Sequence, residues 1–95
     1  MITSFRCKET QKLFDGRVSR KVAAGCARVA QRKLAMLDAA VMLDDLSLPP
    51  GNRLEALHGD REGEHSIRVN DQWRVCFVWN DRAQSAEDVE IVDYH

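Results

Sequence analysis

Seven side chains in the second half of the chain could together cleave a phosphodiester bond. They supply carboxylates, imidazoles, guanidinium groups and a phenol: Glu55, His58, Arg68, Arg74, Asp93, Tyr94 and His95. Cleavage of RNA without a metal needs a base for the ribose 2′-OH, a cation for the phosphate and an acid for the leaving 5′-oxygen. Arginine suits the second role because its planar fork can hold two phosphate oxygens, and histidine suits the other two near neutral pH.

Alternation of apolar residues predicts that most of these groups share one face of a sheet. The residues expected to point into the core are Leu54, Ala56, Ile67, Val69, Trp73, Val75, Phe77, Val89 and Ile91. The residues between them must point the other way. Glu55, Arg68, Arg74 and Tyr94 therefore belong to the opposite face, with His58 just beyond the first of these strands and Asp93 and His95 at the rim. Alternation does not show that they converge on one phosphate.

The elements that must position these residues are two helices followed by strands. We expect a short strand at residues 2–5, a short helix at residues 8–14 and a longer helix from about Arg20 to Leu43, whose apolar residues have helical spacing. A Leu-Pro-Pro-Gly-Asn stretch at residues 48–52 ends the helical half, and turns are expected at Asn70-Asp71 and at residues 80–86. This order predicts a single α+β domain over residues 1–95, with two N-terminal helices packed on one face of a mostly antiparallel, twisted β-sheet.

Each candidate also has an ordinary structural explanation when it is taken alone. An arginine on a strand is more often a surface ion-pair partner, His58 could be loop polarity, Tyr94 could cover the sheet edge and His95 could be a frayed end. Trp73 and Trp79 are better explained as core residues than as platforms for bases. The three cysteines are odd in number, have no metal-ligand spacing and are expected to be reduced packing residues.

Charge is distributed unevenly along the chain, although the net charge is −1. Residues 1–43 hold nine Lys/Arg against three Asp/Glu, and residues 44–95 hold five against twelve. The basic half fits either a solvated helix or a nucleic-acid contact; its candidate contacts are Arg20, Lys21, Arg28, Arg32 and Lys33. No segment suits a signal peptide or a membrane span, so a cytoplasmic location is expected. No motif predicts a metal or another cofactor.

The stretch from Asn52 to His95 resembles the RelE/HigB-like toxins, particularly the HigB or plasmid maintenance killer branch. The likeness rests on four segments: residues 53–63 (RLEALHGDREG), residues 66–70 (SIRVN), residues 73–77 (WRVCF) and the closing residues 92–95 (VDYH). The opening residues 1–5 (MITSF) and residues 12–14 (KLF) are also similar to this branch. The likeness therefore covers nearly the whole chain in one order.

The resemblance implies a ribosome-dependent ribonuclease of a type II toxin–antitoxin system. Such toxins enter the ribosomal A site and cut mRNA without a metal, and a HigA-like helix-turn-helix antitoxin both inhibits them and represses the operon DNA. The resemblance makes Arg74 the phosphate-contacting arginine and Asp93, Tyr94 and His95 the terminal catalytic group. Where the family often has His-x-x-Lys, this chain has Glu55 and His58, so the proton-transfer groups on that side are in doubt.

Two other functions remain open at this point. A RelE-fold protein with little nuclease activity could act by binding its antitoxin or by blocking the ribosome, and the Glu55/His58 departure keeps that alternative alive. An RNA-binding protein outside any toxin system would have no small helix-turn-helix gene beside its own.

Overall fold

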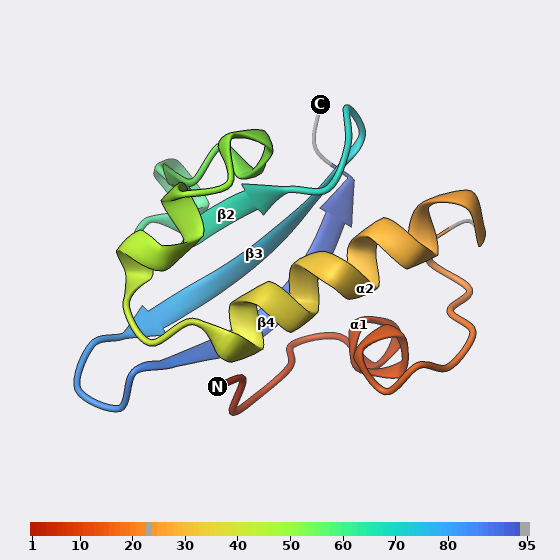
Figure 1. Cartoon of the computed structure of the whole chain (residues 1–95), viewed down its shortest axis with the longest axis horizontal. Coiled ribbons are helices and arrows are strands. Elements are labelled where there is room, and N and C mark those ends of the chain that lie inside the picture. The colour runs from red at the N-terminus through yellow and green to blue at the C-terminus, as the bar shows by residue number, and fades with distance from the viewer. Residues whose placement is uncertain (23, 94–95) are drawn as a thin grey trace.

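The second half of the chain forms one antiparallel sheet (Figure 1). The computed structural model describes residues 1–22 and 24–93. The strands are β1 (Glu55–Ala56), β2 (His65–Arg68), β3 (Trp73–Asn80) and β4 (Ser85–Asp93), in the spatial order β1-β2-β3-β4. Asn70 closes the predicted turn between β2 and β3, because its side-chain oxygen accepts the N–H groups of Gln72 and Trp73.

The first helix, α1 (Lys8–Phe14), is confirmed with the predicted bounds. Two residues after its last residue, Gly16 has a φ of +81°, a left-handed conformation that favours glycine. The Gly16 N–H donates to the Leu13 carbonyl at 3.0 Å, which satisfies one of the carbonyls that the end of the helix leaves open.

The second helix, α2 (Ala24–Ala39), is shorter than the predicted helix from Arg20 to Leu43. Before it, the N–H groups of Arg20 and Lys21 donate to the Glu9 carboxylate and the Ser19 hydroxyl, so both basic residues lie in the connecting segment.

After α2, the Asp45 carboxylate accepts two backbone N–H groups at residues 41 and 42. Local side-chain acceptors of this kind compete with the helical ladder. Two 3₁₀ helices follow, η1 (Leu43–Ser47) and η2 (Pro50–Asn52).

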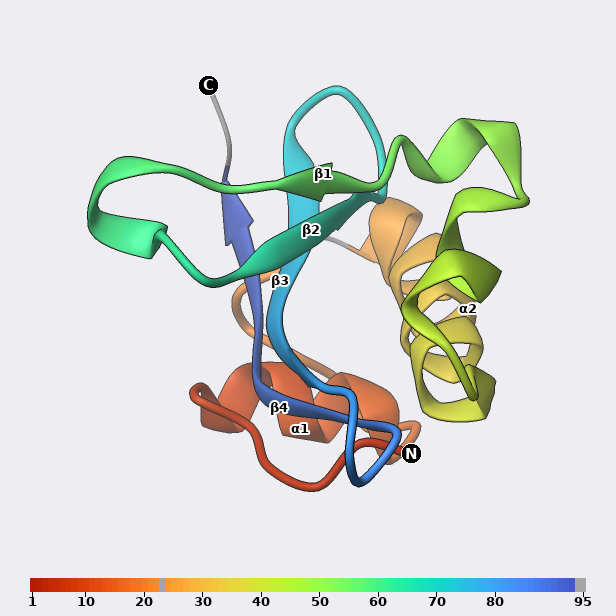
Figure 2. The same ribbon diagram turned by 90° about the vertical axis from the view of Figure 1, so that its left-hand side faces the viewer.

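Both helices pack on one face of the sheet, as predicted. Figure 2 shows α2 alongside the sheet and α1 beneath β4. Leu34 and Leu37 of α2 join Val75, Phe77 and Ile91 in one buried cluster. At α1, the Thr10 hydroxyl accepts the N–H of Ile91 at 3.0 Å. Within the described residues, no helix has the length and apolar character needed to cross a membrane.

Two predictions at the edges of the sheet are wrong. Ala56 is exposed rather than turned inward, because β1 has two residues at the edge and the chain buries Leu57 instead. Residues 2–5 do not form a strand; Ile2 and Phe5 make two isolated parallel bridges to Ala86 and Val89. This segment still lies along the outer edge of β4 and covers it, which protects the edge from pairing with another chain.

We predict that Glu9 makes a contribution to the stability of the fold that is lost in acid. Its carboxylate accepts the Arg20 N–H and the Lys12 ammonium, and these contacts lower its pKa from 4.5 to about 2. Because the folded pKa is depressed, the stabilisation is present above about pH 4.5 and is lost as the pH falls toward 2. Urea unfolding between pH 2 and 6 should show that Glu9→Gln is less stable than the unmodified chain above pH 5 and that this difference shrinks below it. A difference that stays constant with pH would contradict the prediction.

Candidate active site

The guanidinium of Arg74 is buried on the sheet face opposite α2, which we call the helix-free face. Strand register places Arg74 opposite Arg68 on one side and opposite Val92 on the other, and cross-strand partners point to the same face. The predicted face is therefore confirmed, but the Arg74 side chain is only 9% exposed. It is not the surface ion-pair residue that a lone strand arginine would ordinarily be.

Two neighbouring groups fix the orientation of this guanidinium. Arg74 donates through Nε to the Ser66 hydroxyl at 2.7 Å and through a terminal nitrogen to the Arg53 carbonyl, also at 2.7 Å. Arg53 has a φ of +45°, the left-handed conformation that is costly for a residue with a Cβ. Buried cations are costly unless they are paired and hydrogen-bonded, so these acceptors are what make the position tenable.

Glu55 lies beside Arg74 on the helix-free face, the face predicted for both residues. Its carboxylate lies 3.9 Å from the Arg74 guanidinium and is half exposed. Arg68 lies opposite Arg74 across the strands and forms an ion pair with Asp71. Two arginine side chains on adjacent strands therefore share one face, each beside a carboxylate.

The other predicted catalytic residues are less closely tied to Arg74. His58 is exposed in the loop between β1 and β2, and Asp93 ends β4, where the Gln72 amide donates to it at 3.2 Å. Register pairs Asp93 with Trp73, one residue before Arg74. Tyr94 and His95 lie outside the described residues.

An ion cluster holds the 57–64 loop, which carries His58, onto the helix-free face. Arg61 contacts Glu64 at 3.2 Å and Glu90 of β4 at 3.3 Å, and Arg6 contacts Glu64 at 3.5 Å. Cys76 lies beneath the loop, fully buried, and burial raises the pKa of its thiol. Cys76 is thus a packing residue, as predicted, whereas Cys7 and Cys26 are only partly buried.

The predicted RNA-contacting residues divide into two groups. Arg20, Arg28 and Arg32 are exposed. Lys21 instead turns inward, 4.0 Å from Glu90 and 3.7 Å from the Cys7 sulfur. Lys33 donates to Asn52, and burial together with the charges of Arg32 and Arg68 lowers the pKa of its amine. Arg32, Lys33 and Arg68 therefore form one positive region that joins α2 to the end of β2.

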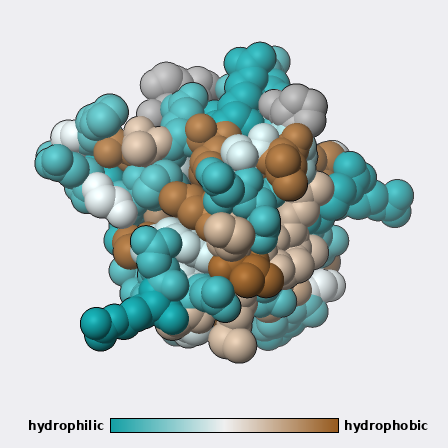
Figure 3. Space-filling model, turned by 60° about the vertical axis from the view of Figure 1, so that its left-hand side comes forward, coloured by the Kyte–Doolittle hydropathy of each residue, from teal (hydrophilic) through white to brown (hydrophobic). Residues whose placement is uncertain are grey.

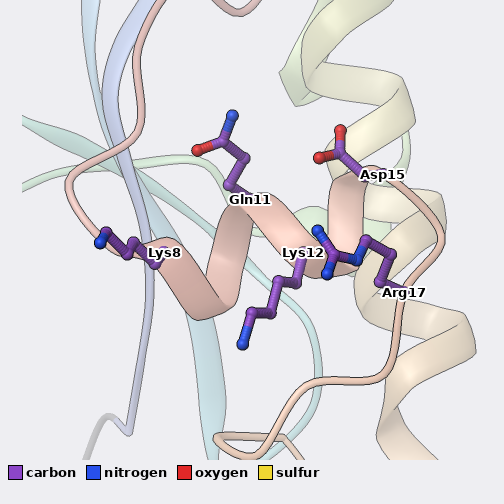
Figure 4. Close-up of a pocket in the computed structure, with 5 residues that line it drawn as sticks. All are labelled: Lys8, Gln11, Lys12, Asp15 and Arg17. Carbon is purple, nitrogen blue, oxygen red and sulfur yellow. The ribbon is translucent and has the colours of Figure 1, made fainter.

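A surface hollow beside α1 gathers none of the predicted catalytic residues. It has a volume of about 270 Å³. Figure 4 shows the residues that line it: Lys8, Gln11, Lys12, Asp15 and Arg17. Its Lys12 is already bonded to Glu9 at 2.9 Å. We therefore place the candidate active site at Arg74 and not in this hollow.

Sequence reasoning missed two partners of Arg74. Ser66 shares the alternation of Arg68 and Arg74, so its position on the same face could have been read from the sequence. The Arg53 carbonyl could not, because a backbone acceptor turned inward by a left-handed residue leaves no signature in residue type.

We predict that Ser66 and Arg74 are energetically coupled. Removing the hydroxyl leaves a buried charged donor without its acceptor, which costs about 1–3 kcal/mol. A double-mutant cycle with Ser66→Ala and Arg74→Ala, followed by urea unfolding, should give a coupling energy of about 1–3 kcal/mol. Additive effects of the two substitutions would show that the bond contributes nothing to stability.

Comparison with known proteins agrees with the resemblance. Residues 3–95 match the family model of the RelE-like toxin of type II toxin–antitoxin system HigB. Toxin HigB-1 of Vibrio cholerae is 40% identical over 82 residues, covering 85% of this chain and 86% of that protein. Endoribonuclease HigB of Proteus vulgaris is 35% identical over 77 residues, covering 81% and 83%.

Solved structures share the fold at low sequence identity. A mutant of YafQ from Escherichia coli superposes with a TM-score of 0.60 at 14% identity, covering 98% of this chain and 93% of that one. YafQ from the Escherichia coli strain BL21(DE3) superposes with a TM-score of 0.54 at 12% identity, with the same coverage of both chains. The family match over almost the whole chain and the identity to a curated relative lead to one conclusion: this chain belongs to the HigB-like family of RelE-like toxins from type II toxin–antitoxin systems.

Proposed function

We propose that the chain is a metal-independent endoribonuclease that cuts mRNA in the ribosomal A site and thereby stops translation. The observation that carries the proposal is the pinned Arg74 guanidinium, with Arg68 opposite it and the Glu55 carboxylate 3.9 Å away. A cation held in place before the substrate arrives stabilises the charge that develops on a phosphate without further reorganisation. The name of the Proteus vulgaris relative, an endoribonuclease, supports the same chemistry.

The proposed roles of Arg74, Arg68 and Glu55 follow from their positions on the helix-free face, and those of His58, Asp93, Tyr94 and His95 follow from the resemblance. Arg74 holds the scissile phosphate, and Arg68 adds a second positive charge on the same face. Glu55 and His58 lie on the β1 side and are the candidates for taking the 2′-OH proton. Asp93, Tyr94 and His95 form the terminal catalytic group that stabilises and protonates the leaving oxygen. A base must reach the proton directly or through one water, and Glu55 already lies beside the phosphate-binding cation.

The positive region beyond the site supports a path for RNA. Arg28 and Arg32 are exposed on α2, and Lys33 and Arg68 link that helix to the catalytic face. We propose that these residues, with Arg20 in the connecting segment, contact ribosomal RNA or mRNA. Lys21 is left out of this proposal because its ammonium lies 4.0 Å from the Glu90 carboxylate.

A toxin of this kind has an antitoxin partner, which the family establishes. We propose that the partner is a HigA-like helix-turn-helix protein, that operator DNA is reached only through it, and that the toxin acts on 70S ribosomes in the cytoplasm.

One observation favours the alternative of a binding protein with little nuclease activity. The Glu55 carboxylate beside Arg74 competes with a phosphate for the same cation. On that alternative, the chain would arrest growth by occupying the ribosome.

We expect Arg74→Ala to abolish toxicity, because losing a preorganised charge donor typically costs about 10²–10³ in rate. Removal of Tyr94 and His95 should have the same effect. The measurement is mapping of mRNA 5′ ends after induction of the chain alone, with circular dichroism to show that the variants fold. Codon-phased cuts that vanish in Arg74→Ala support the nuclease. Growth arrest without such cuts supports the binding alternative.

We expect the Arg28→Gln, Arg32→Gln double variant to bind ribosomes less tightly and with a weaker salt dependence. Each lost phosphate contact should lower the slope of log K against log salt by about 0.7–0.9. Arg82→Gln is the matched control, since Arg82 is exposed in the turn between β3 and β4. If the double variant and the control have equal slopes, these residues do not contact RNA.

A further inference from the structure

The segment that follows α2 exposes an unusual share of large apolar side chains. Val41, Met42 and Leu48 are 54%, 59% and 78% exposed, and they fall within eight residues. Within the described residues, only Met1 and Val18 are further examples. Scattered apolar residues need no explanation, but a group of them suggests an interaction site. Figure 3 brings this side of the molecule forward and shows apolar side chains gathered among hydrophilic ones.

A shallow hollow adjoins the exposed group. It measures about 230 Å³, and its apolar lining comes from Met36, Ala39, Ala40, Leu46 and Pro49. The α2–η1 surface, which we define as Val41, Met42, Leu48 and this hollow, thus combines projecting side chains with a recess. A recess of this kind can receive one large apolar side chain of a partner, the arrangement that carries most binding energy in protein interfaces.

The charged side chains of the segment that forms this surface are all negative, while Lys33 reaches the edge of the hollow through its bond to Asn52. Between residues 34 and 52, the charged side chains are Asp38, Asp44 and Asp45, and there is no lysine or arginine. A nucleic-acid backbone or an anionic membrane would be repelled. A second copy is disfavoured too, because a two-fold interface sets the same patch against itself and would oppose these carboxylates to one another. The occupant that fits is a protein segment with an apolar anchor flanked by Lys or Arg.

The exposed apolar residues of this surface lie at the other end of α2 from the candidate active site, although the hollow reaches Asn52, next to the Arg53 whose carbonyl binds Arg74. In Figure 1 the chain leaves α2 and enters η1 at the left, whereas the β2–β3 turn and the end of β4 lie at the upper right. The basic residues of α2, Arg28, Arg32 and Lys33, belong to its first ten positions, and Lys33 is coupled to Arg68. An occupant held by Met42 and Leu48 therefore need not cover Arg74.

We propose that the α2–η1 surface is the docking site for the antitoxin, which presents a basic segment with an apolar anchor. The proposal rests on the chain's membership of a toxin–antitoxin family. It adds the place where the antitoxin binds and the kind of side chains that bind it. Binding is then governed by Met42, Leu48 and the acidic rim, and not by the catalytic residues.

The test introduces a positive charge at the exposed apolar residues. Met42→Arg and Leu48→Arg place a cation against the basic partner, while Val18→Arg is the matched control because Val18 is 90% exposed elsewhere. Affinity for the purified antitoxin encoded beside this gene is measured by titration calorimetry, with all variants made in an Arg74→Ala background so that toxicity does not interfere. Thermal unfolding checks that each variant is folded.

We expect the first two variants to bind at least about tenfold more weakly, a loss of about 1.4 kcal/mol, and the control to change by less than about twofold. With Arg74 restored, Met42→Arg and Leu48→Arg should remain toxic and no longer be neutralised by the antitoxin. Unchanged affinity in both variants would overturn the proposal. The proposal would also be overturned if light scattering showed that the chain forms a homodimer, and if the two variants lost that homodimer while still binding the antitoxin. If the expected binding pattern appears but no RNA is cut, the docking site stands and the proposed nuclease function fails.

Discussion

The candidate site depends on keeping one guanidinium buried and oriented. A buried cation is tolerable only when its donors are satisfied, and Arg74 meets that condition through the Ser66 hydroxyl and the Arg53 carbonyl. The carbonyl faces Arg74 because Arg53 adopts a left-handed conformation directly after η2. Asn52, fully buried, fixes that turn by donating to the Leu46 carbonyl and accepting from Lys33. The orientation of Arg74 is thus set by a chain of contacts that begins on α2.

A second set of charges orders the other part of the helix-free face. The 57–64 loop contains few apolar residues, and its attachment comes from Arg61 and Glu64 meeting Glu90 and Arg6. Glu64 is nearly buried, so removing its cationic partners would cost more than breaking a surface ion pair. Because Arg6 follows the N-terminal segment that lies along β4, its ion pairs tie the loop that carries His58 to that segment as well as to β4.

Periodicity predicted the parts of the structure that depend on which side a residue faces. The inward set of β3 and β4 and the shared face of Arg68 and Arg74 follow from alternation and are confirmed. The turn at Asn70, predicted from its Asn-Asp pair, is confirmed too. The errors occur where a particular bond replaces a regular pattern. Glu9 and Ser19 accept hydrogen bonds from backbone N–H groups before α2, and Asp45 accepts them after it. The helix is therefore shorter than the range over which its apolar residues have helical spacing. Alternation predicts which face of the sheet a side chain lies on, but not how deeply it is buried. The burial of Arg74 beside the Arg53 carbonyl could therefore not be predicted from the sequence.

The uneven charge of the sequence places surfaces of opposite charge at the two ends of α2. Its first ten residues carry cations that continue onto the strand bearing Arg68, while the segment after it carries only carboxylates among exposed apolar side chains. Charges of opposite sign at the two ends discriminate between partners more than they add affinity to either one. A polyanion is drawn to the Arg74 end and repelled from the other, where a basic protein segment is favoured. A toxin this small can then hold its antitoxin without covering the residues proposed to cut RNA. Inhibition would follow from the added bulk of the partner, which would hinder entry into a confined site on the ribosome.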